Sequence, residues 1–216
     1  MGTESLFRMA VSPEDWRDNG DGSAWVIGTK LVDGDVDRLQ HVHYLTLVDT
    51  RLPADFLGRL PQLELLDLRG ALSARTASQL ATVPKLRALA INRARTLTEL
   101  PALGSSLEFL DLYGLSRLTA LPPMHGLTNL RRVNLGQLRS LSDWTPLTDL
   151  PQLEELELTN HLTPDLDVLA QLAARPTFAR FGWSAPDESP RKVAEATQAA
   201  DRPKPDHLGI RDLWNA

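Results

Sequence analysis

Two histidines come closest to a pattern that could do metal chemistry. His41 and His43 are two residues apart, so in a strand both would project from one face and form half of a metal site. No third ligand follows at a suitable spacing, which favours a solvated pair. The segment "DGDVD" (33–37) begins like a calcium-binding loop, but Arg38 stands where the loop needs glycine and Tyr44 where it needs glutamate. A polar turn is the better interpretation.

No other motif indicates an enzyme. The sequence contains no cysteine, which removes disulfides, thiolate nucleophiles and cysteine-bound zinc. It also contains neither a phosphate-binding loop nor a nucleophile elbow. We therefore expect a non-catalytic protein with no cofactor and no metal.

The composition narrows the choice of partner and compartment. The net charge of -5 over 216 residues leaves no basic footprint, which argues against nucleic acid and an anionic membrane as partners. No stretch approaches the roughly 18 apolar residues of a membrane span. Glu4 and Arg8 interrupt the region where a signal peptide needs an apolar core. We expect a cytoplasmic protein that is monomeric on its own.

The remaining candidate residues, those for binding a partner, belong to a sequence repeat. The stretch "LEFLDLYGLSRLTALP" (107–122) spaces its leucines to fit neither a plain helix nor a plain strand. Its frame, apolar at positions 1, 4 and 6, recurs in copies that start at residues 42, 63, 86, 107, 130 and 153. Such a near-constant period indicates a solenoid. Looser copies flank them, "GSAWVI" from Gly22 and "FARFGW" from Phe178.

The frame resembles the LxxLxLxxN/C pattern of the leucine-rich-repeat family. The resemblance covers about residues 22–186 and implies an α/β solenoid, with a parallel concave sheet of about seven to eight strands. The convex side would mix short helices and extended segments. One departure is that position 9 carries no asparagine, and in the central copies Leu115 and Leu138 would add to the core instead.

The resemblance also suggests how the chain is divided. Residues 1–21 would form an N-terminal cap, 22–186 the solenoid, and 187–216 a linker and tail. On the convex side we expect helices over 73–85 and 163–176, the second with Thr163 as N-cap. Ser189 and Pro190 would begin another helix. The apolar end, Ile210, Leu213 and Trp214, would either dock on the solenoid or serve as a short linear motif.

The strand positions that point away from the core define a candidate binding surface. Leu65, Phe109 and Tyr113 would lie exposed on the concave sheet beside charged side chains, and an apolar centre with a polar surround is typical of a protein-binding hot spot. The alternative is that these apolar residues are exposed singly and without a function. The charged side chains beside them would then form cross-strand ion pairs that add solubility. The predicted partner-binding residues are Tyr44, Leu65, Asp67, Arg69, Phe109, Asp111, Tyr113, Arg132 and Glu155.

The pattern therefore predicts a protein-binding module. We expect it to recognise one protein partner through the concave strand face, as an inhibitor, immunity or adaptor protein. The first alternative is a sensing module that binds a glycan, peptide or nucleic-acid fragment on the same face. An enzyme with a site at His41 and His43 is the third.

Overall fold

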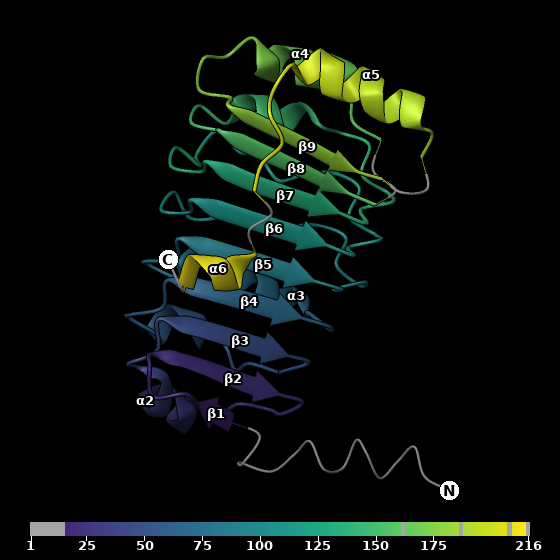
Figure 1. Cartoon of the computed structure of the whole chain (residues 1–216). Coiled ribbons are helices and arrows are strands. Elements are labelled where there is room, and N and C mark those ends of the chain that lie inside the picture. Colours follow the sequence, from purple (N-terminus) through teal and green to yellow (C-terminus); the bar gives the residue numbers. More distant parts are fainter. Residues whose placement is uncertain (1–15, 161–162, 186–187, 207–208, 215–216) are drawn as a thin grey trace, which may run out of the picture.

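The structure, a computed structural model, describes residues 16–160, 163–185, 188–206 and 209–214. The described strands form one sheet in the order of the sequence (Figure 1). All neighbouring strands are parallel except the first pair. The strands are β1 (Trp16–Asp18), β2 (Ser23–Ile27), β3 (Tyr44–Val48), β4 (Leu65–Arg69), β5 (Ala88–Asn92), β6 (Phe109–Tyr113), β7 (Arg132–Gly136), β8 (Glu155–Thr159) and β9 (Arg180–Ser184).

This arrangement confirms the expected leucine-rich-repeat solenoid, with one strand more than expected. The eight strands β2 to β9 are parallel, and β1 adds an antiparallel ninth from the segment assigned to the N-terminal cap. A tight turn joins β1 to β2, in which Gly20 and Gly22 both have positive φ. Pairing with β1 covers the edge of β2, which would otherwise offer free backbone groups to another chain.

The core lies between the sheet and the convex side. In all six clear copies of the repeat, the residues at positions 1, 4 and 6 are buried, as in Leu107, Leu110 and Leu112. Leu115, Leu118 and Leu121 follow the same strand and are buried too. The unusual leucine spacing therefore serves two walls of one core, because the first three leucines come from the strand and the next three from the returning segment.

A left-handed residue ends each of these strands. Position 8 has positive φ in all six copies, at Asp49, Gly70, Arg93, Gly114, Gln137 and Asn160. This backbone conformation turns the chain out of the sheet and towards the convex side. Gly28 has the same conformation after β2, which makes it position 8 of the first coil.

The register of this first coil therefore differs from the prediction by one residue. Ser23 pairs with Tyr44, so the copy begins at Asp21 and not at Gly22. A slip of one residue moves every side chain of a strand to the other face. Ala24 and Val26 are buried in the core, and Trp25 lies on the concave face.

The convex side mixes short helices with extended segments, as expected. Its helical pieces are η2 (Asp33–Asp35), α2 (Val36–Leu39), η3 (Leu57–Arg59), α3 (Ala74–Ser78), η4 (Gln79–Thr82), η5 (Thr145–Asp149) and α4 (Leu166–Ala173). Residues 93–131, all described, contain no helix on the convex side. The expected helix over 73–85 is realised as α3 and η4.

The helix expected over 163–176 begins later than predicted. Asp165, not Thr163, is the N-cap of α4, because its side chain accepts hydrogen bonds from the backbone N–H groups of Asp167 and Val168. A carboxylate at the N-cap also interacts favourably with the positive end of the helix dipole. The prediction of Thr163 as the N-cap is therefore wrong by two residues.

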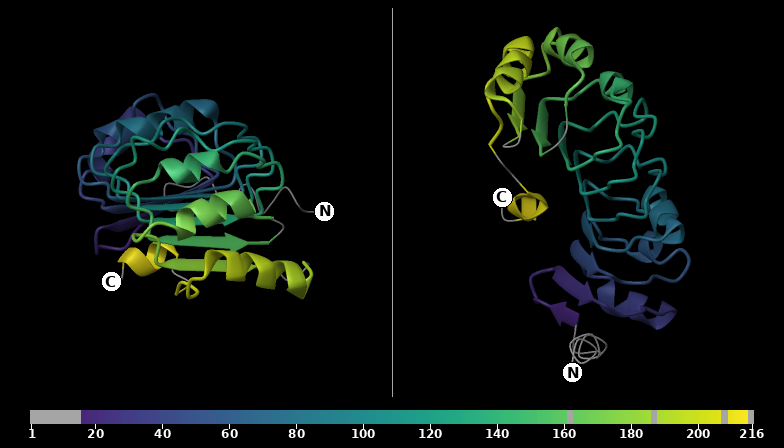
Figure 2. Two further views of the ribbon diagram at one scale, coloured as in Figure 1. Left: turned by 90° about the horizontal axis from the view of Figure 1, so that it is seen from above. Right: turned by 90° about the vertical axis from the view of Figure 1, so that its right-hand side faces the viewer.

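The C-terminal segment closes the solenoid and then returns along its inner side. Helix α5 (Pro190–Ala200), with Ser189 as N-cap, packs against α4 and β9. After it the chain runs back over the sheet to α6 (Ile210–Trp214), which lies against β4 and β5 (Figures 1 and 2). In the right-hand view of Figure 2, the strands line the inner side of an arc and α6 lies within it.

Candidate functional site

The parallel register arranges the concave face in rows. Side chains at positions 3, 5 and 7 of successive strands lie next to one another, about 4.8 Å apart. The row at position 3 changes character along the sheet, because it is mostly apolar from β3 to β6 and charged from β7 to β9. It consists of Ser23, Tyr44, Leu65, Ala88, Phe109, Arg132, Glu155 and Arg180.

Helix α6 covers the apolar part of this face. Ile210 is buried in one cluster with the side chains of β3 to β6, and Leu213 packs against the same cluster. Leu65 is only 7% exposed and Phe109 only 3% exposed. The cluster consists of Tyr44, Leu65, Ala88, Ala90, Phe109 and Ile210.

The expectation that Leu65 and Phe109 are exposed is therefore wrong. The repeat frame correctly places both side chains on the concave side, away from the main core. It does not show that a distant segment of the same chain lies on top of them. An apolar centre on this face exists, but the chain's own tail occupies it.

Arg211 holds the outer side of α6 to the first parallel strand. Its guanidinium lies 4.5 Å from the centre of the Trp25 ring, and that of Arg69 lies 5.4 Å from the same centre. Cations over an aromatic face each contribute about 0.5–1 kcal/mol where water has access. Trp25 was not predicted as a site residue, because the frame that begins at Gly22 gives it an inward position, at the capped end of the solenoid.

Tyr44 lies beside this contact. Burial raises the pKa of its hydroxyl above the ordinary value, and the negative charge of Asp67 adds to the rise. Hydrogen bonds with Thr46 and Arg211 act against it. The Tyr44 side chain therefore stays neutral at physiological pH.

Asp67 and Arg69 form an ion pair at the covered end of the face. Arg69 donates from Nε and Nη2 to Oδ2 of Asp67, at 2.9 and 2.5 Å, and Asn92 donates to Oδ1 at 3.3 Å. The Asp67 side chain is fully buried, whereas that of Arg69 is 38% exposed. Asp67 is therefore inaccessible to a partner, while Arg69 can still be reached.

The two predicted residues of β6 beyond Phe109 are only partly accessible. Tyr113 and Asp111 are half-buried, and Nδ2 of Asn160 donates a hydrogen bond to the Tyr113 hydroxyl at 3.3 Å. A Cβ atom added at Gly136 would come within 2.5 Å of the Tyr113 ring. The absence of a side chain on the neighbouring strand is thus what allows the ring to occupy its place.

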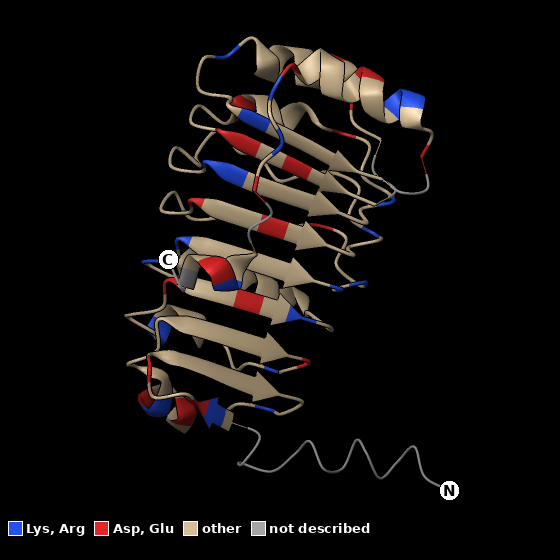
Figure 3. Ribbon diagram, in the orientation of Figure 1, with Lys and Arg blue, Asp and Glu red and all other residues tan. Residues whose placement is uncertain are grey.

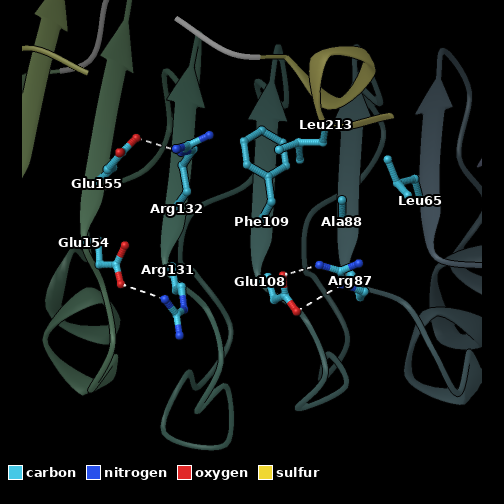
Figure 4. A pocket seen from close by; sticks show the side chains of 10 residues that line it. All are labelled: Leu65, Arg87, Ala88, Glu108, Phe109, Arg131, Arg132, Glu154, Glu155 and Leu213. Atoms are coloured by element: carbon cyan, nitrogen blue, oxygen red, sulfur yellow. Dashed lines mark hydrogen bonds and ion pairs between the residues drawn. The ribbon is translucent and has the colours of Figure 1, made fainter. Parts of the chain in front are cut away.

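A groove of about 430 Å³ remains open beside α6. Its floor is apolar where Ala88, Phe109 and Leu213 meet, as the close view in Figure 4 shows. The lining residues are Leu65, Arg87, Ala88, Glu108, Phe109, Arg131, Arg132, Glu154, Glu155 and Leu213.

Ion pairs form the polar part of this groove. Arg87 contacts Glu108 at 3.0 Å and Arg131 contacts Glu154 at 3.1 Å, all with exposed or half-buried side chains. Arg132 and Glu155 are closer, at 2.7 Å, and less exposed. Basic and acidic strands alternate from β6 to β9 (Figure 3), so the groove carries both signs of charge at short intervals.

The structure brings some of the predicted residues together and removes others from solvent. Leu65, Phe109, Arg132 and Glu155 all line the groove. Tyr44 and Asp67 are buried at the end covered by α6. The groove residues that were not predicted are Arg87, Ala88, Glu108, Arg131, Glu154 and Leu213.

The histidine pair has other partners. His41 Nε2 lies 2.9 Å from Asp18 Oδ2, and His43 Nδ1 lies 3.3 Å from Glu64 Oε1. Among the described residues, no group of three or more His, Asp or Glu side chains could hold a metal ion. In the same part of the chain, no helix has the length and apolar character needed to cross a bilayer.

Few side chains of α6 hold it in its docked position. Full burial of an aliphatic side chain such as Ile210 contributes about 1.5–3 kcal/mol, whereas the partly buried Leu213 and the cation over Trp25 contribute less. Ordering the backbone of the five residues of α6 costs on the order of 1–2 kcal/mol per residue. The tether favours docking, because it keeps α6 near the face at an effective concentration on the order of millimolar.

The tether itself is attached to the last repeat. Arg202 donates to the backbone carbonyls of Phe178 and Ala173, at 2.6 and 2.8 Å, and Phe181 donates to the carbonyl of Pro203 at 3.0 Å. Further along, Arg180 pairs with Asp206 at 3.0 Å. The segment before α6 is thus held at β9.

The strand order and register define the molecule as a leucine-rich-repeat solenoid. No family model matches the sequence, and no curated protein matches it either. Among solved structures, an internalin from Listeria monocytogenes is 16% identical, over 85% of this chain and 73% of that one, with a TM-score of 0.28. A leucine-rich-repeat protein from Leptospira interrogans is also 16% identical, over 87% and 68%, with the same TM-score. Similarity at this level carries no functional argument.

Proposed function

We propose that the protein binds a protein partner through its concave strand face, in the groove between α6 and strands β5 to β8. The observation that supports this most is the composition of the groove. Its apolar floor at Phe109 and Leu213 is bordered by charged side chains, and interfaces between proteins are built in the same way, with an apolar centre and a polar rim.

The charges favour a folded protein as the partner. Arginine and glutamate alternate along the groove, so it has no extended field of one sign that would attract a polyanion. Closely spaced charges of both signs select a partner whose own charges match in position. Inhibitor, immunity and adaptor proteins all act through one such surface and without catalysis, and we place this protein among them.

A small ligand is the second candidate. Pockets for small molecules usually have volumes of about 300–1,000 Å³, and the groove, at about 430 Å³, lies within this range. A glycan, peptide or nucleic-acid fragment that binds here would raise the unfolding temperature by itself. Under the leading proposal, only a macromolecule has this effect.

Reversing one ion pair of the groove tests the leading proposal. In the double variant Arg131→Glu with Glu154→Arg, the pair is retained but its direction is reversed, so the fold should be unaffected. The matched control is Arg191→Glu with Glu195→Arg, which reverses an ion pair on α5, away from the groove. All three proteins would be immobilised and exposed to lysate of the source organism.

We expect the wild type and the α5 control to retain the same single protein from the lysate. The groove variant should bind that purified protein at least about ten-fold more weakly, since misplaced charges at an interface cost on the order of 1–3 kcal/mol. Equal affinity for all three would place the contact outside the groove. If no protein is retained and a small molecule stabilises the chain, the second candidate takes its place.

A further inference from the structure

The tail of the chain shows what the concave face is suited to bind. Ile210 and Leu213, three residues apart on α6, enter or touch the apolar cluster, and Arg211 lies over Trp25. The surface beneath α6 is equally specific. Its large apolar side chains, Tyr44, Leu65 and Phe109, stand at strand positions that would face solvent without α6. The position-3 row of these strands is apolar where the helix lies and charged beyond it.

We propose that α6 is an intramolecular occupant of the binding face, and that the natural partner inserts a short amphipathic helix in its place. The helix would carry two aliphatic residues three apart and a basic residue after the first, like Ile210, Arg211 and Leu213. This inference rests on the proposed function and names the part of the partner that makes the contact.

Three observations indicate that α6 can be displaced. It is five residues long, so it has little stability apart from its docking. It is anchored by two apolar side chains, by the cation of Arg211 over Trp25, and by a hydrogen bond between Arg211 and Tyr44. The segment before it is attached to β9 through Arg180 and Asp206, so the helix can leave while its tether stays in place.

The groove gives an incoming helix a place to begin. It runs from Leu213 over Phe109 to Arg132 and Glu155, next to the position of α6. A partner can therefore contact the charged strands first and then compete for the apolar cluster. In this order of events, Leu65 and Tyr44 lose the cover of α6 only when the apolar side chains of the partner are in place to cover them.

The test uses the full-length protein and a synthetic peptide with the sequence of residues 203–216, labelled for fluorescence anisotropy. The variant Ile210→Ser with Leu213→Ser removes both apolar anchors and should leave the face open. Leu166→Ser is the matched control, because Leu166 is an exposed leucine on α4. A peptide carrying the same two serines controls for unspecific binding.

The peptide should bind the open variant at least about ten-fold more tightly than the wild type, in which the tethered helix competes with it. The Leu166→Ser protein should behave like the wild type, and the serine peptide should bind none of them. Equal affinity for the open variant and the wild type would overturn the proposal. It would also be overturned if an open variant with wild-type circular dichroism and cooperative unfolding bound no peptide.

Arg211→Ala keeps the test decisive if the open variant does not fold. This side chain is exposed, and its removal should tighten peptide binding at least about three-fold, because α6 loses the cation over Trp25 and the hydrogen bond to Tyr44. An unchanged affinity would count against the proposal. A dimer of the wild type with exchanged tails, detected by size-exclusion chromatography, would assign the face to a second copy and would also overturn it.

The peptide test and the lysate test fail independently. A protein that binds wild type and open variant equally well through β6 to β8 would support the proposed function and contradict displacement of α6. Conversely, peptide binding by the open variant establishes that α6 is displaceable whether or not a protein partner is found.

Discussion

The guanidinium of Arg211 lies 4.5 Å from the centre of the Trp25 ring, and this contact joins the last helix of the chain to its first parallel strand. The two residues lie at opposite ends of the sequence, so the contact closes the inner side of the arc over β3 to β5. It leaves the groove along β5 to β8 as the open part of the concave face. A partner on the concave face, as proposed above, would therefore bind beside α6 or replace it.

Arg69 should matter more for stability than an exposed arginine of the same face. Replacement by alanine removes the cation beside the buried Asp67 carboxylate and leaves it the hydrogen bond from Asn92. We expect the free energy of unfolding to fall by about 2 kcal/mol, less than the 3–5 kcal/mol of a fully buried pair because water reaches Arg69.

Arg87→Ala is the control for this change. Arg87 contacts Glu64 and Glu108 with a side chain that is 56% exposed, and we expect a loss below about 1 kcal/mol. Urea unfolding of both variants measures the difference. Similar losses would show that the burial of Asp67 adds nothing to the value of its ion pair.

The pKa of Tyr44 should report whether α6 is docked. The chain has two tyrosines, so in a Tyr113→Phe background the ultraviolet absorbance of phenolate follows Tyr44 alone. Burial raises its pKa above the ordinary value of about 10. Adding Ile210→Ser and Leu213→Ser should move the midpoint back towards that value, because water then reaches the ring.

The sign of the pH dependence follows from the same shift. A folded-state pKa above the unfolded value means that the native protein holds this proton more tightly. The contribution to stability is therefore complete below about pH 10 and is lost as the pH rises through the folded pKa. A Tyr44 midpoint that is the same with and without the two serines would show that α6 does not bury this side chain.

Gly136 and Tyr113 should be coupled. A Cβ atom at position 136 would lie 2.5 Å from the Tyr113 ring, so Gly136→Ala forces the ring to move and should cost about 1–3 kcal/mol. In a Tyr113→Ala background the same substitution should cost at least about 0.5 kcal/mol less, since the ring is gone. A double-mutant cycle by thermal unfolding measures this. Additive losses would place the strain at Thr159, whose hydroxyl is the other close neighbour.

Mutagenesis can distinguish Asp165, the N-cap of α4 in the structure, from Thr163, the N-cap predicted from the sequence. Asp165→Ala removes two hydrogen bonds to the backbone at the start of the helix and should cost about 0.5–2 kcal/mol. Thr163→Ala should have a much smaller effect, because the backbone N–H groups at the start of α4 donate to Asp165 instead. Chemical unfolding of the two variants decides between them, and a larger loss for Thr163→Ala would reinstate the sequence prediction.

Much of the solenoid follows from the spacing of the leucines. Leu107, Leu110 and Leu112 are buried where the frame places them, because every repeat must bury the same positions against its neighbours. The first coil was misplaced by one residue, because the frame from Gly22 points the strongly apolar Trp25 and Ile27 inward, whereas the observed register buries Ala24 and Val26. The pairing of Ser23 with Tyr44 resolves this, and it moves Trp25 from the core to the concave face.

The sequence by itself determined the period, the core positions and the direction in which each strand side chain points, because these depend on contacts between neighbouring repeats. Only the tertiary structure decided which concave residues are accessible. Ile210 and Leu213 are distant in sequence from Leu65 and Phe109, and no periodicity relates them. Their contact arises because the chain reverses at α5 and runs back over the sheet, so the face on which a partner was expected is partly filled by the chain's own last helix.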